Sequence, residues 1–167
     1  MRKEPSQAVL QSKFIYIEHS GLFYEAGEKL FISGSELGCV LANGYRLISV
    51  DGQQFGSHRL AWIYKNGKIP KGNVIDHVNG NPSDDRIQNL RLATRLQNTQ
   101  NRKRSKSCKS GFKGVSLEFG GNRKKPWRAR IVVDKKRYTI GMFLTAEEAF
   151  EAYKEEAKKQ FGEFARF

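Results

Sequence analysis

Short strand-like runs fill the first third of the chain. Apolar residues recur with strand-like spacing over 29–33 and 45–50, and a further short run spans 53–55. An Asp-Gly pair at 51–52 joins the last two runs, and this dipeptide favours a two-residue hairpin turn. The pattern therefore predicts a hairpin here. Residues 1–20 pattern weakly, and we expect their first part to be poorly ordered.

The apolar pattern then changes to the period of a helix. Ser57 is placed to cap the first turn of this helix, and Asn66-Gly67 is placed to end it. Four apolar side chains fall on one helical face: Leu60, Ala61, Ile63 and Tyr64. The strands are therefore followed by an amphipathic helix.

Residues 73–104 combine apolar and turn-forming residues in the order strand, loop, strand, helix. Val74-Ile75 is a short apolar strand, and residues 79–85 form a dense turn-forming loop of Asn, Gly, Pro, Ser and Asp. A second strand spans 89–93. Thr94 and Gln97 then match a capping box, so a helix should follow, with Asn98 in or near its first turn.

Residues 111–167 predict a second small unit of three strands and one helix. Strand patterns lie at 111–119, 127–133 and 137–143, and Thr145 with Glu148 matches another capping box. The helix that follows brings apolar residues to one face: Ala146, Ala149, Phe150, Tyr153, Ala157 and Phe161. Strand alternation points a second set toward this helix: Trp127, Ala129, Ile131, Val133, Tyr138 and Ile140.

Together these elements predict an α+β fold in two domains. We place the first domain at 1–102, a basic linker at 103–110 and the second domain, a three-stranded antiparallel sheet on one helix, at 111–167. Both domains contain enough apolar residues for a packed core, since 38% of the side chains are hydrophobic.

The charge balance indicates a polyanionic partner. The chain has 167 residues and a net charge of +13, which argues against an acidic or neutral small-molecule enzyme. Residues 1–101 carry 12 basic and 9 acidic side chains, whereas residues 102–167 carry 18 and 8. Nucleic acid is the first candidate partner, and an anionic membrane surface is the second. The segment 101–111 holds five basic residues and no acid, so it either follows a phosphate backbone or forms a solvated loop.

Other classes find little support in the composition. No apolar run approaches the roughly 20 residues of a transmembrane helix, and no signal-peptide pattern follows the N-terminus. Cys39 and Cys108 form neither a CxxC pair nor a zinc-finger spacing, so we expect two reduced thiols in a cytoplasmic protein. We expect no membrane association and no small-molecule cofactor.

One segment resembles a known nuclease motif. The residues that carry the likeness are Asp76-His77, Asn79-Gly80, Asp84, Arg86, Asn89-Leu90, Thr94, Asn98 and Asn101, with His58-Arg59-Leu60 before them. Their order and spacing resemble the motif of the HNH endonucleases, in particular the phage and intron-encoded homing branch. The resemblance covers about residues 23–104, with the motif at 73–104, and it implies a ββα-metal nuclease domain.

The chemistry of phosphodiester hydrolysis suits these residue types. A histidine can take a proton from water near neutral pH, and a divalent cation can bind the scissile phosphate and the leaving oxygen. Asp76 and Asn98 offer hard oxygen ligands, which favours Mg²⁺ or Mn²⁺ over Zn²⁺. The resemblance implies that His77 is the general base, that Asp76 and Asn98 hold the metal, and that Asn89 pins the loop that orients His77.

Each of these residues also has a purely structural interpretation. Asn98 can satisfy local backbone groups early in a helix, and Asn89 is mostly structural on either interpretation. We expect Asp84 and Asp85 to stabilise turns in the polar loop. His58 opens an apolar helix and is expected to be structural, although it can also lie near the site.

The C-terminal unit resembles a plant DNA-binding domain. Gly111-Phe-Lys-Gly-Val115, Trp127-Arg-Ala-Arg-Ile131 and Ile140-Gly-Met-Phe143 resemble the ethylene-response-factor (APETALA-type) domain, which also occurs in phage homing endonucleases. That family binds DNA through its sheet. By strand alternation and the basic linker, the expected DNA contacts are Arg102, Lys103, Arg104, Lys113, Ser116, Arg128, Arg130, Arg137 and Thr139.

The sequence thus predicts a site-specific, metal-dependent HNH endonuclease of the homing type that binds double-stranded DNA as a monomer. The alternative is a DNA-binding or regulatory protein with an inactive HNH remnant. A membrane-surface protein is a third interpretation, but the sequence contains no basic amphipathic helix to support it.

Overall fold

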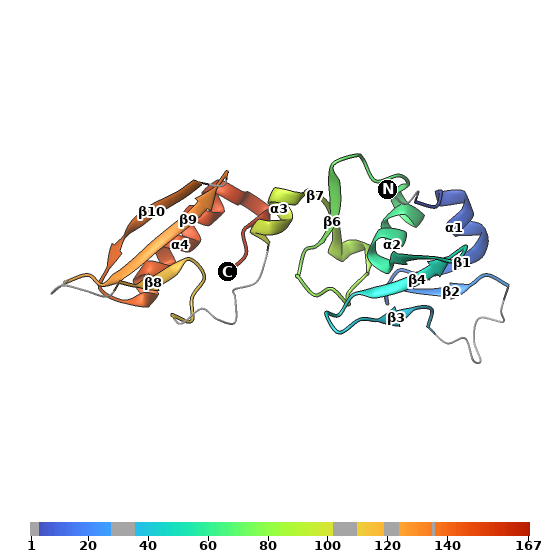
Figure 1. Ribbon diagram of the computed structural model, residues 1–167, viewed down its shortest axis with the longest axis horizontal. Helices are drawn as coiled ribbons and strands as arrows, with labels where there is room; N and C mark the ends of the chain where they lie inside the picture. Colours follow the sequence, from blue (N-terminus) through green and yellow to red (C-terminus); the bar gives the residue numbers. More distant parts are fainter. Residues whose placement is uncertain (1–3, 28–35, 102–109, 119–123, 135) are drawn as a thin grey trace. The chain divides into compact units, whose positions relative to one another are not determined.

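A computed structural model describes residues 4–27, 36–101, 110–118, 124–134 and 136–167 (Figure 1). The chain divides into two compact units, Met1–Arg95 and Leu96–Phe167, so the division falls before the expected linker. Both units mix helices with antiparallel strands, which confirms the α+β class. The strand predicted at 29–33 and most of the linker, including Arg102, Lys103 and Arg104, lie outside the described residues.

Unit 1 begins with a helix and a hairpin that the sequence pattern did not reveal. Helix α1 (Gln7–Lys13) leads into β1 (Phe14–Ile17), which pairs with β2 (Leu22–Glu25). These elements supply Leu10, Phe14, Tyr16 and Phe23 to the core. Helix α1 has seven residues and buries only Leu10, so the sequence shows no helical period of apolar residues there.

A second sheet follows in the strand order β3-β4-β5 (Figure 1, cyan). Its strands are β3 (Cys39–Val40), β4 (Arg46–Val50) and β5 (Gln53–Gly56). Asp51 and Gly52 both have positive φ, at 50° and 74°, as a two-residue hairpin turn between right-twisted strands requires. The predicted hairpin is therefore confirmed, together with its turn chemistry.

Helix α2 (Ser57–Asn66) is present as predicted, but Ser57 is not its N-terminal capping residue. Gly56 occupies the capping position, and Ser57 is the first helical residue. Ser57 is completely buried, and its hydroxyl makes no hydrogen bond within the described part of the chain. The predicted Ser57 cap is therefore wrong, because the side chain enters the core instead of turning back to the backbone. The helix ends at Gly67 with φ of 77°, close to the expected position.

The predicted strand–loop–strand–helix segment is confirmed. Strand β6 (Asn73–His77) pairs antiparallel with β7 (Leu90–Thr94), and a 3₁₀ turn, η1 (Ile87–Asn89), precedes β7. Helix α3 (Arg95–Gln100) follows directly, and from Leu96 onward it belongs to unit 2. Ile75 and Leu90 join the unit 1 core, so the end of β6 is fixed to the rest of the unit.

Unit 2 contains the predicted three strands and helix. Its sheet has the order β10-β9-β8, formed by β10 (Lys136–Phe143), β9 (Trp127–Val133) and β8 (Val115–Leu117). Helix α4 (Ala146–Phe161) packs on this sheet and is followed by a 3₁₀ turn, η2 (Gly162–Phe164). The Glu148 amide donates to Thr145 Oγ1 at 3.1 Å, which confirms Thr145 as the N-cap; the Glu148 carboxylate accepts from the amide of Leu144, one residue before the position that a capping box requires.

The inner face of this sheet follows the predicted alternation with one exception. Ala129 and Ile131 are buried against the helix residues Ala149 and Tyr153. Tyr138, which we expected to face the helix, is 50% exposed. It lies on the edge strand β10, whose pairing with β9 is irregular between Thr139 and Gly141, and the single helix covers the edge less fully.

Gly114 is required by a close approach within unit 2. Its φ is +76°, and a Cβ there would lie 2.8 Å from the Arg130 carbonyl oxygen and overlap the Tyr153 ring. We expect Gly114→Ala to destabilise unit 2 by about 1–3 kcal/mol, the usual cost of such backbone strain, with any steric overlap adding to it. Hydrogen exchange of the β9 amides measures this stability for unit 2 alone.

Gly111 is the matched control for this substitution. Its φ is +80°, but no described atom lies within 4 Å of where a Cβ would be placed. Gly111→Ala should therefore cost only the backbone strain and less than Gly114→Ala. Equal losses for the two variants would show that the contact with Tyr153 and Arg130 contributes nothing.

Candidate active site

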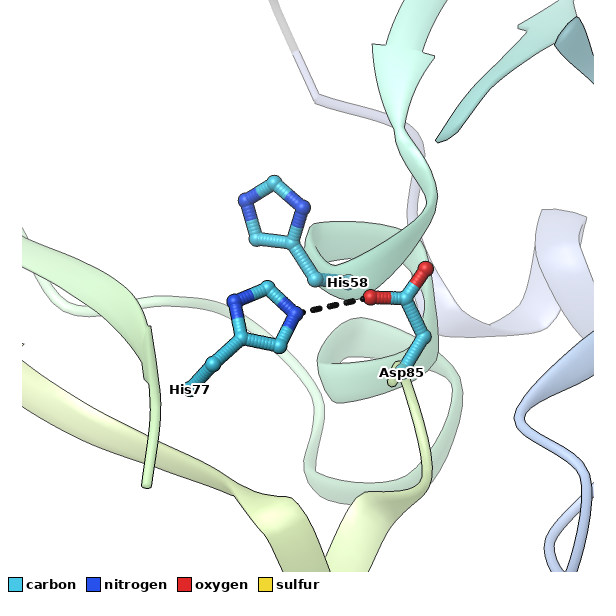
Figure 2. Close-up of side chains that lie close together, drawn as sticks. All are labelled: His58, His77 and Asp85. Carbon is cyan, nitrogen blue, oxygen red and sulfur yellow. Dashed lines mark hydrogen bonds and ion pairs between the residues drawn. The ribbon is translucent and has the colours of Figure 1, made fainter. Parts of the chain in front are cut away.

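His77 and Asp85 form a buried pair at the end of β6 (Figure 2). The His77 Nε2 atom lies 2.9 Å from Asp85 Oδ1, and both side chains are almost fully buried. A carboxylate accepts hydrogen bonds, so Nε2 carries the proton when the ring is neutral. The Nδ1 atom is then the basic nitrogen. This is the arrangement of a general base whose tautomer is set by a carboxylate.

The β1–β2 hairpin contacts the backbone of Asp85. The Tyr16 hydroxyl donates to the Asp85 carbonyl oxygen at 2.8 Å, and burial raises the Tyr16 pKa. Gly21, in the turn between β1 and β2, has φ of +74°, and a Cβ there would lie 2.6 Å from the Asp85 carbonyl carbon. The backbone of the loop between β6 and β7 is therefore packed tightly against the β1–β2 hairpin.

His58 lies beside the pair on the first turn of α2 (Figure 2). Its ring centroid is 5.3 Å from that of His77 and 5.3 Å from that of Tyr45. Burial lowers the His58 pKa to about 4, so this ring is neutral near pH 7. Gly56 leaves the space for it, because a Cβ there would lie 2.6 Å from His58 Cε1. His58 therefore belongs to the site's side-chain cluster.

Asp76 precedes His77 on β6 and has a different partner. Arg91 lies opposite it on β7, and the Arg91 Nε atom donates to Asp76 Oδ2 at 2.9 Å. Asp76 is buried, so the guanidinium compensates a carboxylate that has lost most of its water. Successive strand residues point to opposite faces, which separates Asp76 from the cluster around His77. Its hard anionic oxygens fit a divalent cation of the Mg²⁺ type.

Asn89 ties the polar loop to the start of β7. Its Oδ1 accepts from the Asn79 amide at 3.0 Å, and its Nδ2 donates to the Asp84 carbonyl oxygen at 2.8 Å and to Asn79 Oδ1 at 3.1 Å. All these atoms belong to the loop between β6 and β7. The side chain thus fixes both ends of the segment that carries Asp85.

Asp84 and Asp85 have opposite surroundings although they are adjacent. Asp84 accepts two hydrogen bonds from Arg86, both at 2.6 Å, and these lower its pKa. It also accepts from Asn79, as the predicted turn-stabilising role requires. Asp85 turns inward to His77, a contact that sequence reasoning missed. The two carboxylates differ in burial and in their partners, and the composition of the loop gives no signal of either difference.

The expected DNA-binding side chains of unit 2 divide into engaged and exposed groups. Lys113 donates to the Gln100 and Arg166 carbonyl oxygens at 2.9 and 2.7 Å, and burial lowers its pKa to about 8. Its ammonium binds carbonyl groups of its own unit, so a contact between Lys113 and DNA would have to replace these hydrogen bonds. Arg128 pairs with Glu118 at 2.8 Å.

The remaining members lie on strands with more open surroundings. Arg137 and Thr139 are exposed on β10, and Thr139 lies opposite Arg130 in the β10–β9 register. Arg130 and Ser116 are half-buried. Asn98, the other expected metal ligand, lies on α3.

Comparison with known proteins defines the class of this site. The family model for HNH endonucleases matches residues 55–100, which run from β5 through β6, the polar loop and β7 into α3. The chain therefore carries an HNH endonuclease domain, and His77, Asp85 and Asp76 all lie within it.

Two viral proteins are similar over longer stretches. Protein 3.8 of Escherichia phage T7 is 36% identical over 110 residues, which cover 66% of this chain and 88% of that protein. The chain belongs to the same family as this phage protein. An uncharacterized HNH endonuclease of Acanthamoeba polyphaga mimivirus is 34% identical over 119 residues, covering 71% of this chain but only 59% of the relative.

A solved structure of the HNH homing endonuclease I-HmuI, described as showing DNA binding and cleavage, is 28% identical with a TM-score of 0.43. The match covers 53% of this chain and 51% of that one.

No helix among the described residues is both long and apolar enough to span a membrane.

The hydroxyl of Tyr16 should matter to the site although it lies outside the matched segment. We expect Tyr16→Phe to cost about 0.5–1.5 kcal/mol of unit 1 stability, because one buried hydrogen bond to the Asp85 carbonyl is lost. Hydrogen exchange of the β6 amides measures it. Tyr24→Phe, on the neighbouring strand, is the control and should change exchange little; equal effects would contradict the assignment.

Proposed function

We propose that this protein is a site-specific DNA endonuclease of the homing type that depends on a divalent metal ion. The observation that carries the proposal is the buried His77–Asp85 pair within an HNH domain. The phage and viral relatives and the net charge of +13 support DNA in the host cell as the substrate.

His77 acts as the general base. Its Nδ1 atom takes the proton from the water that attacks phosphorus, and the ring becomes a cation. The Asp85 carboxylate, 2.9 Å from Nε2, stabilises this cation and holds the ring in one orientation. Asn89 acts as a positioning residue, because it fixes the loop that presents Asp85.

Asp76 and Asn98 are the proposed metal ligands, from strand β6 and helix α3. A bound Mg²⁺ or Mn²⁺ ion supplies positive charge to the scissile phosphate and to the leaving oxygen. Arg91 donates to Asp76 Oδ2 at 2.9 Å and so holds this carboxylate in one orientation on β6.

The second unit supplies DNA affinity in this proposal. We propose a nuclease domain, a basic linker and an APETALA-type DNA-binding domain, arranged along the chain in that order. Arg130, Arg137 and Thr139 on the sheet contact double-stranded DNA, and the linker residues Arg102, Lys103 and Arg104 contact phosphates. Ser116 and Arg128 lie opposite each other in the β8–β9 register and extend this surface.

Removal of the base should separate cleavage from binding. We expect His77→Ala to lower the nicking rate of supercoiled plasmid by about 10²–10⁴-fold in Mg²⁺, the usual contribution of a general base. Affinity for DNA should stay within a few-fold. His19→Ala, which removes an exposed histidine, is the matched control. A His77→Ala variant that cleaves at the wild-type rate would refute the role of His77 as the general base.

The metal ligand has a different expected signature. Asp76→Ala should abolish cleavage at every Mg²⁺ concentration. Excess chelator should likewise abolish cleavage by the unmodified protein. Binding of DNA in the absence of metal should persist in both cases, because the proposed DNA contacts lie on other elements. Full cleavage in chelator would contradict the metal requirement.

The contribution of the sheet is measurable through salt. Arg137→Ala should reduce the slope of log affinity against log salt by about 0.9 if the side chain contacts one phosphate. Lys154→Ala is the control, because Lys154 already pairs with Glu151 at 2.6 Å on α4. Identical slopes for the Arg137 variant and the unmodified protein would remove Arg137 from the interface.

A further inference from the structure

We propose that His58, His77 and Asp85 form a binding site for a transition-metal ion such as Zn²⁺, and that a bound ion inactivates the nuclease. The binding part of this proposal stands on the cluster alone, and the inactivation part rests on the proposed function. The site is distinct from Asp76 and Asn98, which offer only oxygen ligands.

The geometry of the cluster suits a small cation. One ligand atom from each of the three residues lies within 4.8 Å of the other two. Ligand atoms around a tetrahedral Zn²⁺ lie about 3.3 Å apart when its bonds are about 2.0 Å. The separation between His77 Nε2 and Asp85 Oδ1 is already 2.9 Å. The ligand atoms that are farthest apart would therefore have to approach each other by at most about 1.5 Å, which side-chain rotation allows.

The donor set favours transition metals over Mg²⁺. Two imidazole nitrogens with one carboxylate oxygen match the preferences of Zn²⁺, Co²⁺ and Ni²⁺, whereas Mg²⁺ takes oxygen ligands. The three side chains come from separate elements: the start of α2, the end of β6 and the loop before η1 (Figure 2). Because each element is fixed by the unit 1 core, the donors are preorganised.

The hydrogen bonding of His58 gives independent support. Its Nδ1 atom is buried and has no hydrogen-bond partner in the part of the chain that the structure describes. A buried polar atom without a partner is costly and calls for an explanation. Asp85 and His77 satisfy each other, so a purely hydrogen-bonded network leaves His58 unexplained. An ion shared by the three residues gives the second imidazole a role.

Metal binding at this place would remove the catalytic base. When Nε2 of His77 binds a cation, the neutral ring carries its proton on Nδ1. That nitrogen then cannot accept a proton from water, and Asp85 is withdrawn from the imidazole at the same time. Zn²⁺ would therefore compete with catalysis even when Mg²⁺ is abundant.

Co²⁺ binding to the full-length protein tests the site without any requirement for activity. We expect one equivalent of Co²⁺ to give the intense visible absorption of a tetrahedral ion, and Zn²⁺ to displace it. His58→Phe keeps a ring in place and should weaken Co²⁺ binding at least tenfold. His19→Ala and Asp76→Asn should bind Co²⁺ as the unmodified protein does. Unchanged binding by His58→Phe would overturn the proposal.

A measurement on the unmodified protein covers the case in which the variant fails to fold. Zn²⁺ should shift the imidazole nitrogen resonances of both His58 and His77 in NMR spectra and leave those of His19 in place. Shifts confined to His19, or no shifts, would overturn the site.

Inhibition is the second arm. Stoichiometric Zn²⁺ should stop Mg²⁺-supported nicking by the unmodified protein, whereas nicking by His58→Phe, measured against its own rate without Zn²⁺, should need at least tenfold more Zn²⁺ for the same inhibition. Equal Zn²⁺ sensitivity of the two proteins would overturn the inactivation. Absence of nicking under all conditions, with Co²⁺ binding intact, would refute the proposed function and leave the metal site standing.

Discussion

The contact between the His77 imidazole and the Asp85 carboxylate places the strongest demand on unit 1. A carboxylate removed from water is costly unless partners replace its hydration, and Asp85 is only 3% exposed. The imidazole provides one partner, but the loop backbone must be held so that the two groups meet. Tyr16 fixes the Asp85 carbonyl, Asn89 ties the two ends of the loop, and the aromatic core of Phe14, Tyr16 and Phe23 supports the whole. The geometry of the His77–Asp85 pair thus depends on residues to which the proposal gives no chemical role.

Internal pairing also accounts for much of the basic charge near these elements. Arg91 pairs with Asp76 and Arg86 with Asp84, both within unit 1. In unit 2, Arg128 pairs with Glu118 and Lys113 binds backbone carbonyls. A basic residue in a DNA-binding protein is therefore not by itself a phosphate contact. Arg137, exposed at an edge strand, is the better candidate among the described sheet residues.

Local signals predicted local structure well. The Asp-Gly turn and the Thr145 N-cap each act within four residues, and both are present with the expected geometry. The misses concern contacts between distant residues. Leu10 reveals no helical period alone, Asp85 looks like its neighbour Asp84 in sequence, and Ser57 is buried by packing that propensity does not describe. The motif residues His77 and Asp76 were found because their spacing is local, whereas the cluster of His58 with Asp85 arises only from tertiary packing.

The close approach of Gly21 to the Asp85 backbone has a consequence for protein engineering. The segment that matches the HNH family begins at residue 55, yet the loop inside it rests on the turn between β1 and β2. Transplanting residues 55–100 into another protein would leave Asp85 without its support and expose the aromatic core behind it. A portable nuclease cassette from this chain has to start upstream of α1, and any recombination breakpoint between the hairpin and the loop would have to preserve glycine at position 21.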